Sequence, residues 1–280
     1  MRGSSLEQHV QRLDRVPLLW DREGEFRERV KGRTPGVFLD YDGTLTPIVE
    51  DYTRACLADE MRRTIATLAR YYVVAIVSGR DLATTRELVG LDSLFYAGSH
   101  GFEIGGPEGW HETVAHGVQA LPELDRAEAE LRHELAGIPG HAVERKRFAV
   151  AIHYRRAAAA DASRIAVAVD RAAARHPRLR KGSGKKVWRL QPDIAWDKGC
   201  AVLALLEHLD LDRPEIVPIY IGDDLTDEDV FRALQGRGVG IVVRGEDLSR
   251  DTVAQYALAD CNDVRRFLEL LIALEPESPS

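Results

Sequence analysis

Gly36-Val37-Phe38-Leu39-Asp40-Tyr41-Asp42-Gly43-Thr44 is the stretch of sequence from which the fold is most readily predicted. The apolar run 36–39 is short enough to be a buried strand, and the turn that follows carries two carboxylates. In open α/β sheets, ligands bind at the carboxyl ends of the strands. Two acids one residue apart, beside a glycine that lets the backbone approach a ligand, suit a site that holds a divalent cation and supplies a nucleophile.

Residues 40–44 also allow two simpler interpretations. A calcium-binding loop needs glycine at its sixth position and usually glutamate at its twelfth. Counted from Asp40, these positions are Leu45 and Asp51, which excludes that loop. A plain surface turn stays open, although such a turn seldom follows a buried strand with two acids at its tip.

Composition indicates an ordinary globular chain, with 280 residues of which 45% are hydrophobic. The net charge of -7 provides no basic field for a nucleic acid, and the basic run 178–181 is interpreted as a solvated face. Cys56, Cys200 and Cys261 are too far apart in sequence for a visible disulfide framework or paired zinc spacing. We therefore expect a cytoplasmic protein with no nucleic-acid partner.

The first thirty or so residues mix acidic and basic side chains and contain no long apolar stretch. This pattern predicts neither a signal peptide nor a membrane span, and hence no membrane partner. We expect the segment to be helical and to lie at the periphery of the fold.

Apolar runs alternate with longer helical patterns along much of the chain. Because the runs are apolar on both faces, they predict a parallel sheet covered on each side by helices, that is, an α/β fold. The runs are 37–39, 73–77, 216–221 and 239–243.

Between the second and third of these runs, the pattern changes to that of an inserted α+β domain. We expect core segments at 1–116 and 192–280 and an insert at 117–191. The insert is predicted to contain helices 121–135 and 157–175, and strands around Val143, at 148–154, around Leu179 and at 185–190.

Two further motifs indicate phosphate chemistry. One follows the apolar run 73–77 and reads Ser78-Gly79-Arg80-Asp81, and the other, Lys198-Gly199, opens a predicted helix. A helix start with free N–H groups binds phosphate, and a lysine can set a positive charge against phosphoryl oxygens. Each also has a structural alternative, because serine is a favoured N-cap and most lysines are simply solvated.

The last strand leads into an acidic cluster, Gly222-Asp223-Asp224-Leu225-Thr226-Asp227-Glu228-Asp229. Magnesium favours oxygen ligands, so we assign Asp223 and Asp227 to a cation. Thr226 is predicted to cap a helix whose first turn carries Glu228 and Asp229.

In this order, the motifs at Asp40–Thr44, Ser78, Lys198 and Gly222–Asp227 resemble those of haloacid dehalogenase-like phosphohydrolases, which have a Rossmann-like core and an inserted cap. Further motifs look like those of trehalose-6-phosphate phosphatases. They are Asp40–Ile48, Gly98-Ser99-His100-Gly101, Glu144-Arg145-Lys146 with His153-Tyr154-Arg155, and Gly222–Asp229.

The resemblance implies an Mg²⁺-dependent hydrolysis of trehalose 6-phosphate to trehalose and phosphate. Asp40 would form an aspartyl-phosphate, and Asp42 would protonate the leaving oxygen and then deprotonate water. Mg²⁺ would be held by Asp40, the backbone carbonyl of Asp42, and Asp223, with Asp227 as a further candidate. Ser78 and Lys198 would neutralise the phosphoryl oxygens.

The resemblance also implies sugar-binding residues. Glu144 and Lys146 match a glutamate-x-lysine pair that hydrogen-bonds sugar hydroxyls in the family, and Gly79, Arg80 and His100 are further substrate-binding candidates. From the residues alone, 144–147 also reads as a polar hairpin turn, and a lone loop histidine is more often structural.

Arg189 departs from the family pattern, in which a glutamate follows in the cap strand after Gly-Lys. By strand alternation, Arg189 lies on the other face of the strand from Trp188 and Leu190. A guanidinium only donates hydrogen bonds, whereas a glutamate carboxylate only accepts them, so the two side chains would bind different sugar groups. Arg189 could also form an ion pair with Glu144. Another phosphorylated disaccharide is therefore an alternative substrate, a sugar phosphomutase is an alternative activity, and a non-catalytic sugar-phosphate sensor is a third class. We expect a monomer that binds a small sugar phosphate.

Overall fold

The structure is a computed structural model that describes residues 10–49, 55–184, 186–245 and 248–274. It divides into two compact units, a core unit (1–111 and 196–280) and an inserted unit (112–195). The predicted insert, 117–191, falls within the second unit. None of the described helices is both long and apolar enough to cross a membrane.

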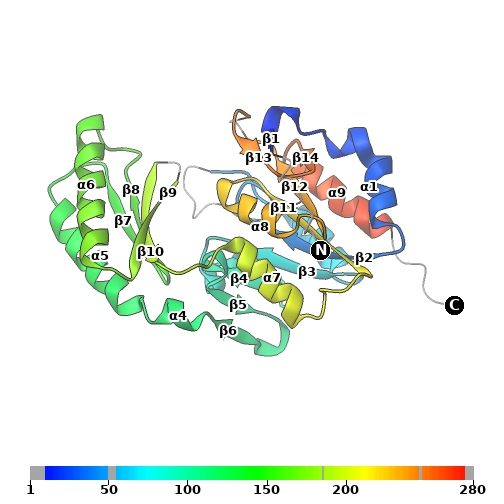
Figure 1. Cartoon of the computed structure of the whole chain (residues 1–280), viewed down its shortest axis with the longest axis horizontal. Coiled ribbons are helices and arrows are strands. Elements are labelled where there is room, and N and C mark those ends of the chain that lie inside the picture. Colours follow the sequence, from blue (N-terminus) through cyan, green and yellow to red (C-terminus); the bar gives the residue numbers. More distant parts are fainter. Residues whose placement is uncertain (1–9, 50–54, 185, 246–247, 275–280) are drawn as a thin grey trace, which may run out of the picture. The chain divides into compact units, whose positions relative to one another are not determined.

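The centre of the core unit is an eight-stranded sheet with the order β14-β12-β11-β2-β3-β4-β5-β6 (Figure 1). The strands from β14 to β4 pair in parallel, and β5 is antiparallel to β4. The predicted α/β class and its four buried strands are confirmed. The strands are β2 (Thr34–Leu39), β3 (Val73–Val77), β4 (Phe95–Gly98), β5 (Glu103–Gly105), β6 (His111–Thr113), β11 (Ile216–Gly222), β12 (Val239–Val243) and β14 (Tyr256–Leu258).

Helices cover both faces of this sheet, as runs apolar on both sides require. Val37 and Leu39 of β2 belong to one buried cluster, with residues of α1, α2, α3 and α9, whereas Phe38 belongs to the other, with α7 and α8. The helices are α1 (Glu23–Val30), α2 (Asp59–Leu68), α3 (Leu82–Val89), α7 (Lys198–His208), α8 (Glu228–Ala233) and α9 (Cys261–Ala273).

The N-terminal segment is largely helical, as expected, but it is not peripheral. Its described part contains β1 (Gln11–Arg12), which pairs with β13 (Asp251–Thr252), two short 3₁₀ helices at 13–15 and 19–22, and then α1. Leu19 and Phe26 are fully buried. These core contacts could not be predicted from the sequence, because the few apolar residues that make them are scattered among charged residues.

The inserted unit is a four-stranded antiparallel sheet, ordered β7-β8-β10-β9, covered by helices. Val150, Ile152 and Leu190 share a buried cluster with α5 and α6. The elements are α4 (Ala115–Val118), α5 (Leu121–Leu135), β7 (Ala142–Lys146), β8 (Ala149–His153), α6 (Ala159–Arg175), β9 (Leu179–Gly184) and β10 (Val187–Pro192).

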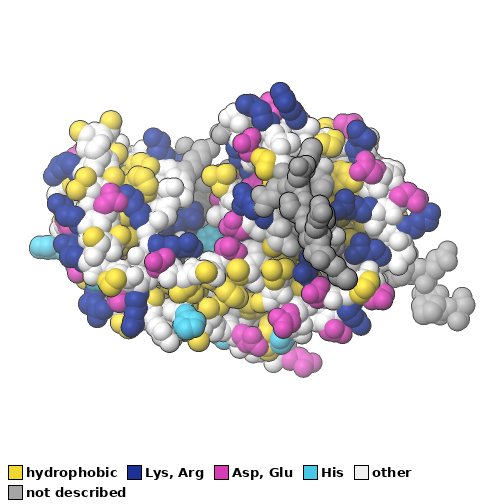
Figure 2. Space-filling view, viewed as in Figure 1, with side chains coloured by type: hydrophobic (Ala, Val, Ile, Leu, Met, Phe, Trp, Pro, Cys, Tyr) yellow, Lys and Arg dark blue, Asp and Glu magenta, His cyan; other side chains and the backbone are white. Residues whose placement is uncertain are grey.

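Acidic and basic side chains are interspersed over the visible face of each unit (Figure 2). This distribution agrees with a chain of modest net charge, -7 over 280 residues.

Candidate active site

Asp40 lies immediately beyond the carboxyl end of β2, in the middle of the core sheet. Its backbone N–H donates to the carbonyl of Ile221 on β11 (2.9 Å), and only 4% of the residue is exposed. Burial raises the pKa of Asp40 well above its usual range, against the opposing charge of Lys198. A buried carboxylate of this kind needs cationic partners to stay ionised.

Lys198 supplies one such partner from the first position of α7, where Asp197 caps the helix by accepting from the Cys200 N–H (2.8 Å). Its Nζ donates to Asp40 Oδ1 (2.7 Å) and to Asp227 Oδ1 (2.8 Å). Burial alone would lower the pKa of Lys198, but the two carboxylates outweigh it and raise the pKa above its ordinary value. Lys198 is therefore an ammonium ion and not a solvated surface lysine.

Asp227 is fully buried, and its carboxylate already accepts several protein hydrogen bonds. Oδ1 accepts from Lys198 and from the Tyr220 hydroxyl (2.6 Å), and Oδ2 accepts from the Asp224 N–H (2.8 Å). Asp224 and Asp227 form a capping box at the start of a 3₁₀ helix, 225–227. The prediction that Thr226 is the N-cap is wrong, because Asp224 is the N-cap of this 3₁₀ helix and Asp227 is the N-cap of α8, whose first turn carries Glu228 and Asp229 as predicted.

Asp223 completes a cluster of carboxylates at the ends of β2 and β11. One ligand oxygen from each of Asp40, Asp223 and Asp227 lies within 4.8 Å of the others. Asp223 Oδ1 is buried, and it has no hydrogen-bond partner among the described residues. Burial, then the charges of Asp227 and Asp224, raises the pKa of Asp223 to about 7. These oxygen donors fit a hard divalent cation, which would supply the missing positive charge.

Gly43 lets the Asp40 turn approach this cluster closely. Its φ is +83°, and a Cβ at this position would overlap the Asp223 carboxylate. The Gly43 N–H donates to the Thr46 carbonyl (2.8 Å), which closes the turn. Glycine is required here both for the backbone conformation and for space.

Asp42, the second acid of the turn, accepts two hydrogen bonds from one guanidinium. Arg80 Nε lies 2.7 Å from Asp42 Oδ2, and Arg80 Nη2 lies 2.6 Å from Asp42 Oδ1. The Arg80 side chain is 8% exposed, whereas that of Asp42 is 43% exposed. The half-exposed carboxylate is therefore in reach of solvent and of a ligand.

Ser78, Gly79 and His100 lie together next to this pair. The Ser78 Oγ accepts from the Arg80 N–H (3.1 Å), so Ser78 does not cap α3, whose N-cap is Asp81. The His100 N–H donates to the Ser78 carbonyl (2.9 Å), and a Cβ on Gly79 would overlap the His100 ring.

His100 and the preceding Ser99 both have left-handed backbone conformations, with φ of +56° and +52°. The Ser99 N–H donates to the Arg80 carbonyl (2.6 Å), and its Oγ donates to Asp81 Oδ1 (2.8 Å). Left-handed non-glycine residues are costly, and they persist where surrounding contacts determine them. These contacts hold the His100 ring against the loop that carries Ser78.

The inserted unit carries the predicted sugar-binding residues on one face of its sheet. Glu144 on β7 and Arg189 on β10 both lie opposite Ala151 of β8, which places them in one row across the strands. Glu144 Oε2 lies 2.8 Å from His153 Nε2. Lys146, two residues beyond Glu144 on β7, faces the same side by strand alternation. Arg189 alternates with Trp188 and Leu190, which pack into the unit's core as predicted.

Sequence reasoning missed two contributors to the core site. Tyr220 reaches Asp227 from β11, although its position in the sequence indicates only a buried strand residue. Glu228, interpreted as a helix-start residue, is 3% exposed. It accepts from Arg250 Nη1 (2.8 Å), while Arg250 Nη2 donates to the Asp223 carbonyl (2.7 Å). No local motif signals a contact across 22 residues of sequence.

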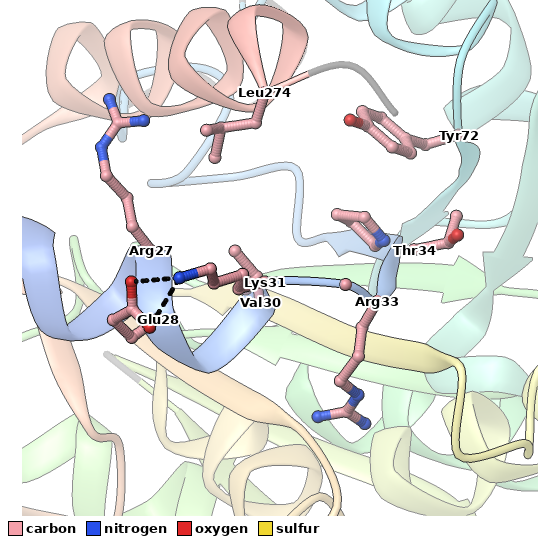
Figure 3. A pocket seen from close by; sticks show the side chains of 10 residues that line it. Arg27, Glu28, Val30, Lys31, Arg33, Thr34, Tyr72 and Leu274 are labelled. Carbon is pink, nitrogen blue, oxygen red and sulfur yellow. Dashed lines mark hydrogen bonds and ion pairs between the residues drawn. The ribbon is translucent and has the colours of Figure 1, made fainter. Parts of the chain in front are cut away.

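A cavity of about 720 Å³ lies at the opposite end of β2, lined by residues that include Arg27, Lys31, Arg33 and Tyr72 (Figure 3). The three basic side chains already have partners. Lys31 donates to Glu28, as the dashed lines show, and Arg27 donates to Glu23. Arg33 donates to two backbone carbonyls. Thr34 at the start of β2 lines this cavity, whereas Asp40 follows its other end. The cavity is therefore separate from the carboxylate cluster.

Comparison with known proteins gives one consistent result. A family model described as "Trehalose-phosphatase" matches residues 38–262. The trehalose-phosphate phosphatase of Mycobacterium tuberculosis is 45% identical over 249 residues, which cover 88% of this chain and 63% of that protein. The corresponding protein of Mycobacterium ulcerans is 46% identical over 235 residues, 83% of this chain and 60% of that protein. The chain thus spans about three fifths of the length of these relatives.

Solved structures agree. The C-terminal domain of Candida albicans trehalose-6-phosphate phosphatase has a TM-score of 0.77 at 25% identity and covers 92% of this chain and 99% of that one. Trehalose-6-phosphate phosphatase of Aspergillus fumigatus has a TM-score of 0.67 at 29% identity, with the same coverage. Both the core and the inserted elements are thus included in the likeness.

Proposed function

Because the chain belongs to the trehalose-phosphatase family, we propose that it hydrolyses trehalose 6-phosphate to trehalose and phosphate, with Mg²⁺ as its cofactor. The observation that best supports this proposal is the buried Asp40 carboxylate, bonded to Lys198 (2.7 Å) and grouped with Asp223. A nucleophile beside a fixed ammonium and a cation-binding cluster suits transfer of a phosphoryl group, where catalysis is mostly positioning and charge stabilisation.

In the first step, an Asp40 carboxylate oxygen attacks phosphorus, and the bond between phosphorus and the sugar oxygen breaks. Asp42 gives its proton to that leaving oxygen. In the second step, Asp42 takes a proton from water, the water oxygen attacks phosphorus, and the bond to Asp40 breaks. Phosphate leaves and Asp40 is restored.

Ser78 and Lys198 neutralise the phosphoryl oxygens in this proposal. The Ser78 Oγ accepts from the Arg80 N–H, so its own hydrogen can be donated to a phosphoryl oxygen. Lys198 is held by Asp227, whose carboxylate is satisfied by protein donors.

Asp40, the Asp42 carbonyl and Asp223 would hold the Mg²⁺, with Asp227 beside them. When bound, the ion neutralises charge on the phosphoryl group and on the carboxylates. The unpartnered Asp223 oxygen supports this assignment.

Glu144, Lys146 and Arg189 are the proposed sugar ligands of the inserted unit, and Gly79, Arg80 and His100 those of the core unit. Arg189 supports a second candidate substrate, another phosphorylated disaccharide, because it replaces a hydrogen-bond acceptor with a donor. A cytoplasmic, monomeric enzyme remains part of the proposal.

The test is phosphate release from a panel containing trehalose 6-phosphate, other disaccharide phosphates and glucose 6-phosphate, each with Mg²⁺ or with a chelator. We expect release with Mg²⁺, highest for a disaccharide phosphate, and its loss in Asp40→Asn. Asp229→Asn is the matched control, because its side chain is 38% exposed and pairs with Arg232. Return of the phosphoryl group to another hydroxyl of the sugar, without free phosphate, would instead identify a phosphomutase.

A further inference from the structure

The ion pair between Arg80 and Asp42 fixes the plane of a carboxylate, not merely its charge. Its contacts of 2.7 and 2.6 Å run from different guanidinium nitrogens to different carboxylate oxygens. Such a fork-to-fork pair is directional, which a lysine cannot reproduce because its ammonium is a point charge.

Arg80 is the immobile member of this pair. Its backbone N–H donates to Ser78 Oγ (3.1 Å), and its carbonyl accepts from the Ser99 N–H (2.6 Å). Its guanidinium carbon lies 5.5 Å from the centroid of the buried Tyr41 ring. Asp42, by contrast, has a side chain that is 43% exposed. The direction of the Asp42 carboxylate is therefore determined by Arg80.

We propose that Arg80 is a positioning residue that orients Asp42 for its two proton transfers. This inference rests on the proposed function, and for Arg80 it replaces the direct sugar contact proposed there. Proton transfer requires the catalytic group within hydrogen-bond reach of the reacting oxygen, and a misplacement of about 1 Å can cost about 10²-fold in rate. A half-exposed aspartate without a fixed partner would lose that orientation to rotation.

The first experiment measures kcat and KM of Arg80→Lys for trehalose 6-phosphate, alone and combined with Asp42→Asn. We expect kcat to fall about 10- to 100-fold while KM changes less than about threefold, because orientation acts on the chemical step. The double variant should be no slower than Asp42→Asn, since Arg80 acts through Asp42.

Arg86→Lys is the matched control. Arg86 also lies 5.5 Å from a tyrosine ring centroid, that of Tyr96, but it pairs with Asp92. This variant should keep wild-type kinetics. A rise in KM at constant kcat, losses that multiply in the double variant, or an equal loss in Arg86→Lys would overturn the proposal.

A second measurement uses p-nitrophenyl phosphate, whose leaving group needs no proton. In Arg80→Lys, transfer to Asp40 should remain fast while hydrolysis slows, which gives a burst of p-nitrophenolate close to the enzyme concentration. Equal slowing of both steps would contradict the inference. If the wild type releases no phosphate from any sugar phosphate, the proposed function fails, whereas this assay still tests Arg80.

Discussion

Because Gly43 has no side chain, the turn after β2 can lie close to Asp223 at the end of β11. The residue combines φ of +83° with a position where a Cβ would overlap the Asp223 carboxylate. The Asp-Gly pair was visible in the sequence as a tight turn. The contact with Asp223 was not, because it joins residues that lie far apart in the chain.

Gly43→Ala should therefore lower kcat/KM for phosphate release by about 10²-fold or more, because it displaces Asp223 from the cluster. Gly109→Ala is the control, since Gly109 has φ of +78° with nothing within 4 Å of its Cβ position. Both variants carry the left-handed backbone cost of about 1–2 kcal/mol. Equal kinetic losses in the two would show that space beside Asp223 is irrelevant.

Arg189 is the residue at which substrate preference is best tested. Arg189→Glu should raise kcat/KM for trehalose 6-phosphate relative to other disaccharide phosphates by about tenfold, because an acceptor replaces a donor at a proposed sugar-binding position. Arg164→Glu on α6 makes the same charge change at a side chain that is 65% exposed and should leave the ranking unaltered. An unchanged ranking in Arg189→Glu would refute the assignment.

At the scale of elements, the buried strands were predictable because each is a continuous apolar run between helical patterns. The short strands β4, β5, β6 and β14 were not predicted, since three or four residues carry too little periodicity. The N-cap before α8 was misplaced because Asp224, Thr226 and Asp227 are all residue types that cap helices: Asp224 caps the 3₁₀ helix in a capping box with Asp227, and Asp227 is the N-cap of α8.

Tyr220 links strand β11 to the acidic 3₁₀ turn and provides a test of that junction. Tyr220→Phe removes one donor to Asp227, which should cost about 1 kcal/mol of folding free energy and lower kcat by loosening Lys198. Tyr256→Phe on β14 removes a comparable hydroxyl contact, to Glu25 (3.1 Å), away from the site. Thermal melting and phosphate release should separate them: similar Tm losses are expected, with a kcat loss in Tyr220→Phe only. A kcat loss in both would argue against a specific role.

At the scale of the whole molecule, the acidic cluster makes stability depend on pH and on cations. Asp223 has a pKa of about 7 in the folded protein, against 3.8 for an ordinary aspartate. Between these values the folded state binds a proton that the unfolded state has lost. The stability that this proton contributes is present at low pH and is lost as the pH rises through about 7.

We therefore expect Mg²⁺ to raise Tm more at pH 8 than at pH 5.5, relative to chelator-treated protein, because the ion replaces the missing proton. Calorimetric melting at both pH values measures the difference. In Asp223→Asn, the dependence of the Mg²⁺ effect on pH should shrink. A rise in Tm with Mg²⁺ that is as large at pH 5.5 as at pH 8 would be inconsistent with a cation bound at Asp223.

The core site was largely predictable because parallel strands bring their carboxyl ends to one edge of a sheet. Asp40, Lys198, Asp223 and Asp227 meet there as the motifs indicated. What could not be predicted is the network behind them, such as Tyr220 and the pair of Arg80 with Asp42, because side-chain pairing across elements leaves no periodic signal.

Trapping the phosphorylated enzyme tests the central claim most directly. Wild-type protein is mixed with sugar phosphate and Mg²⁺, quenched within one turnover, reduced with tritium-labelled borohydride, which displaces the phosphate and converts the acyl phosphate to a labelled alcohol, and mapped by mass spectrometry. The label and the reduced side chain should appear at Asp40 and be absent from Asp40→Asn. Turnover without a label on the protein, or a label on another residue, would contradict the account.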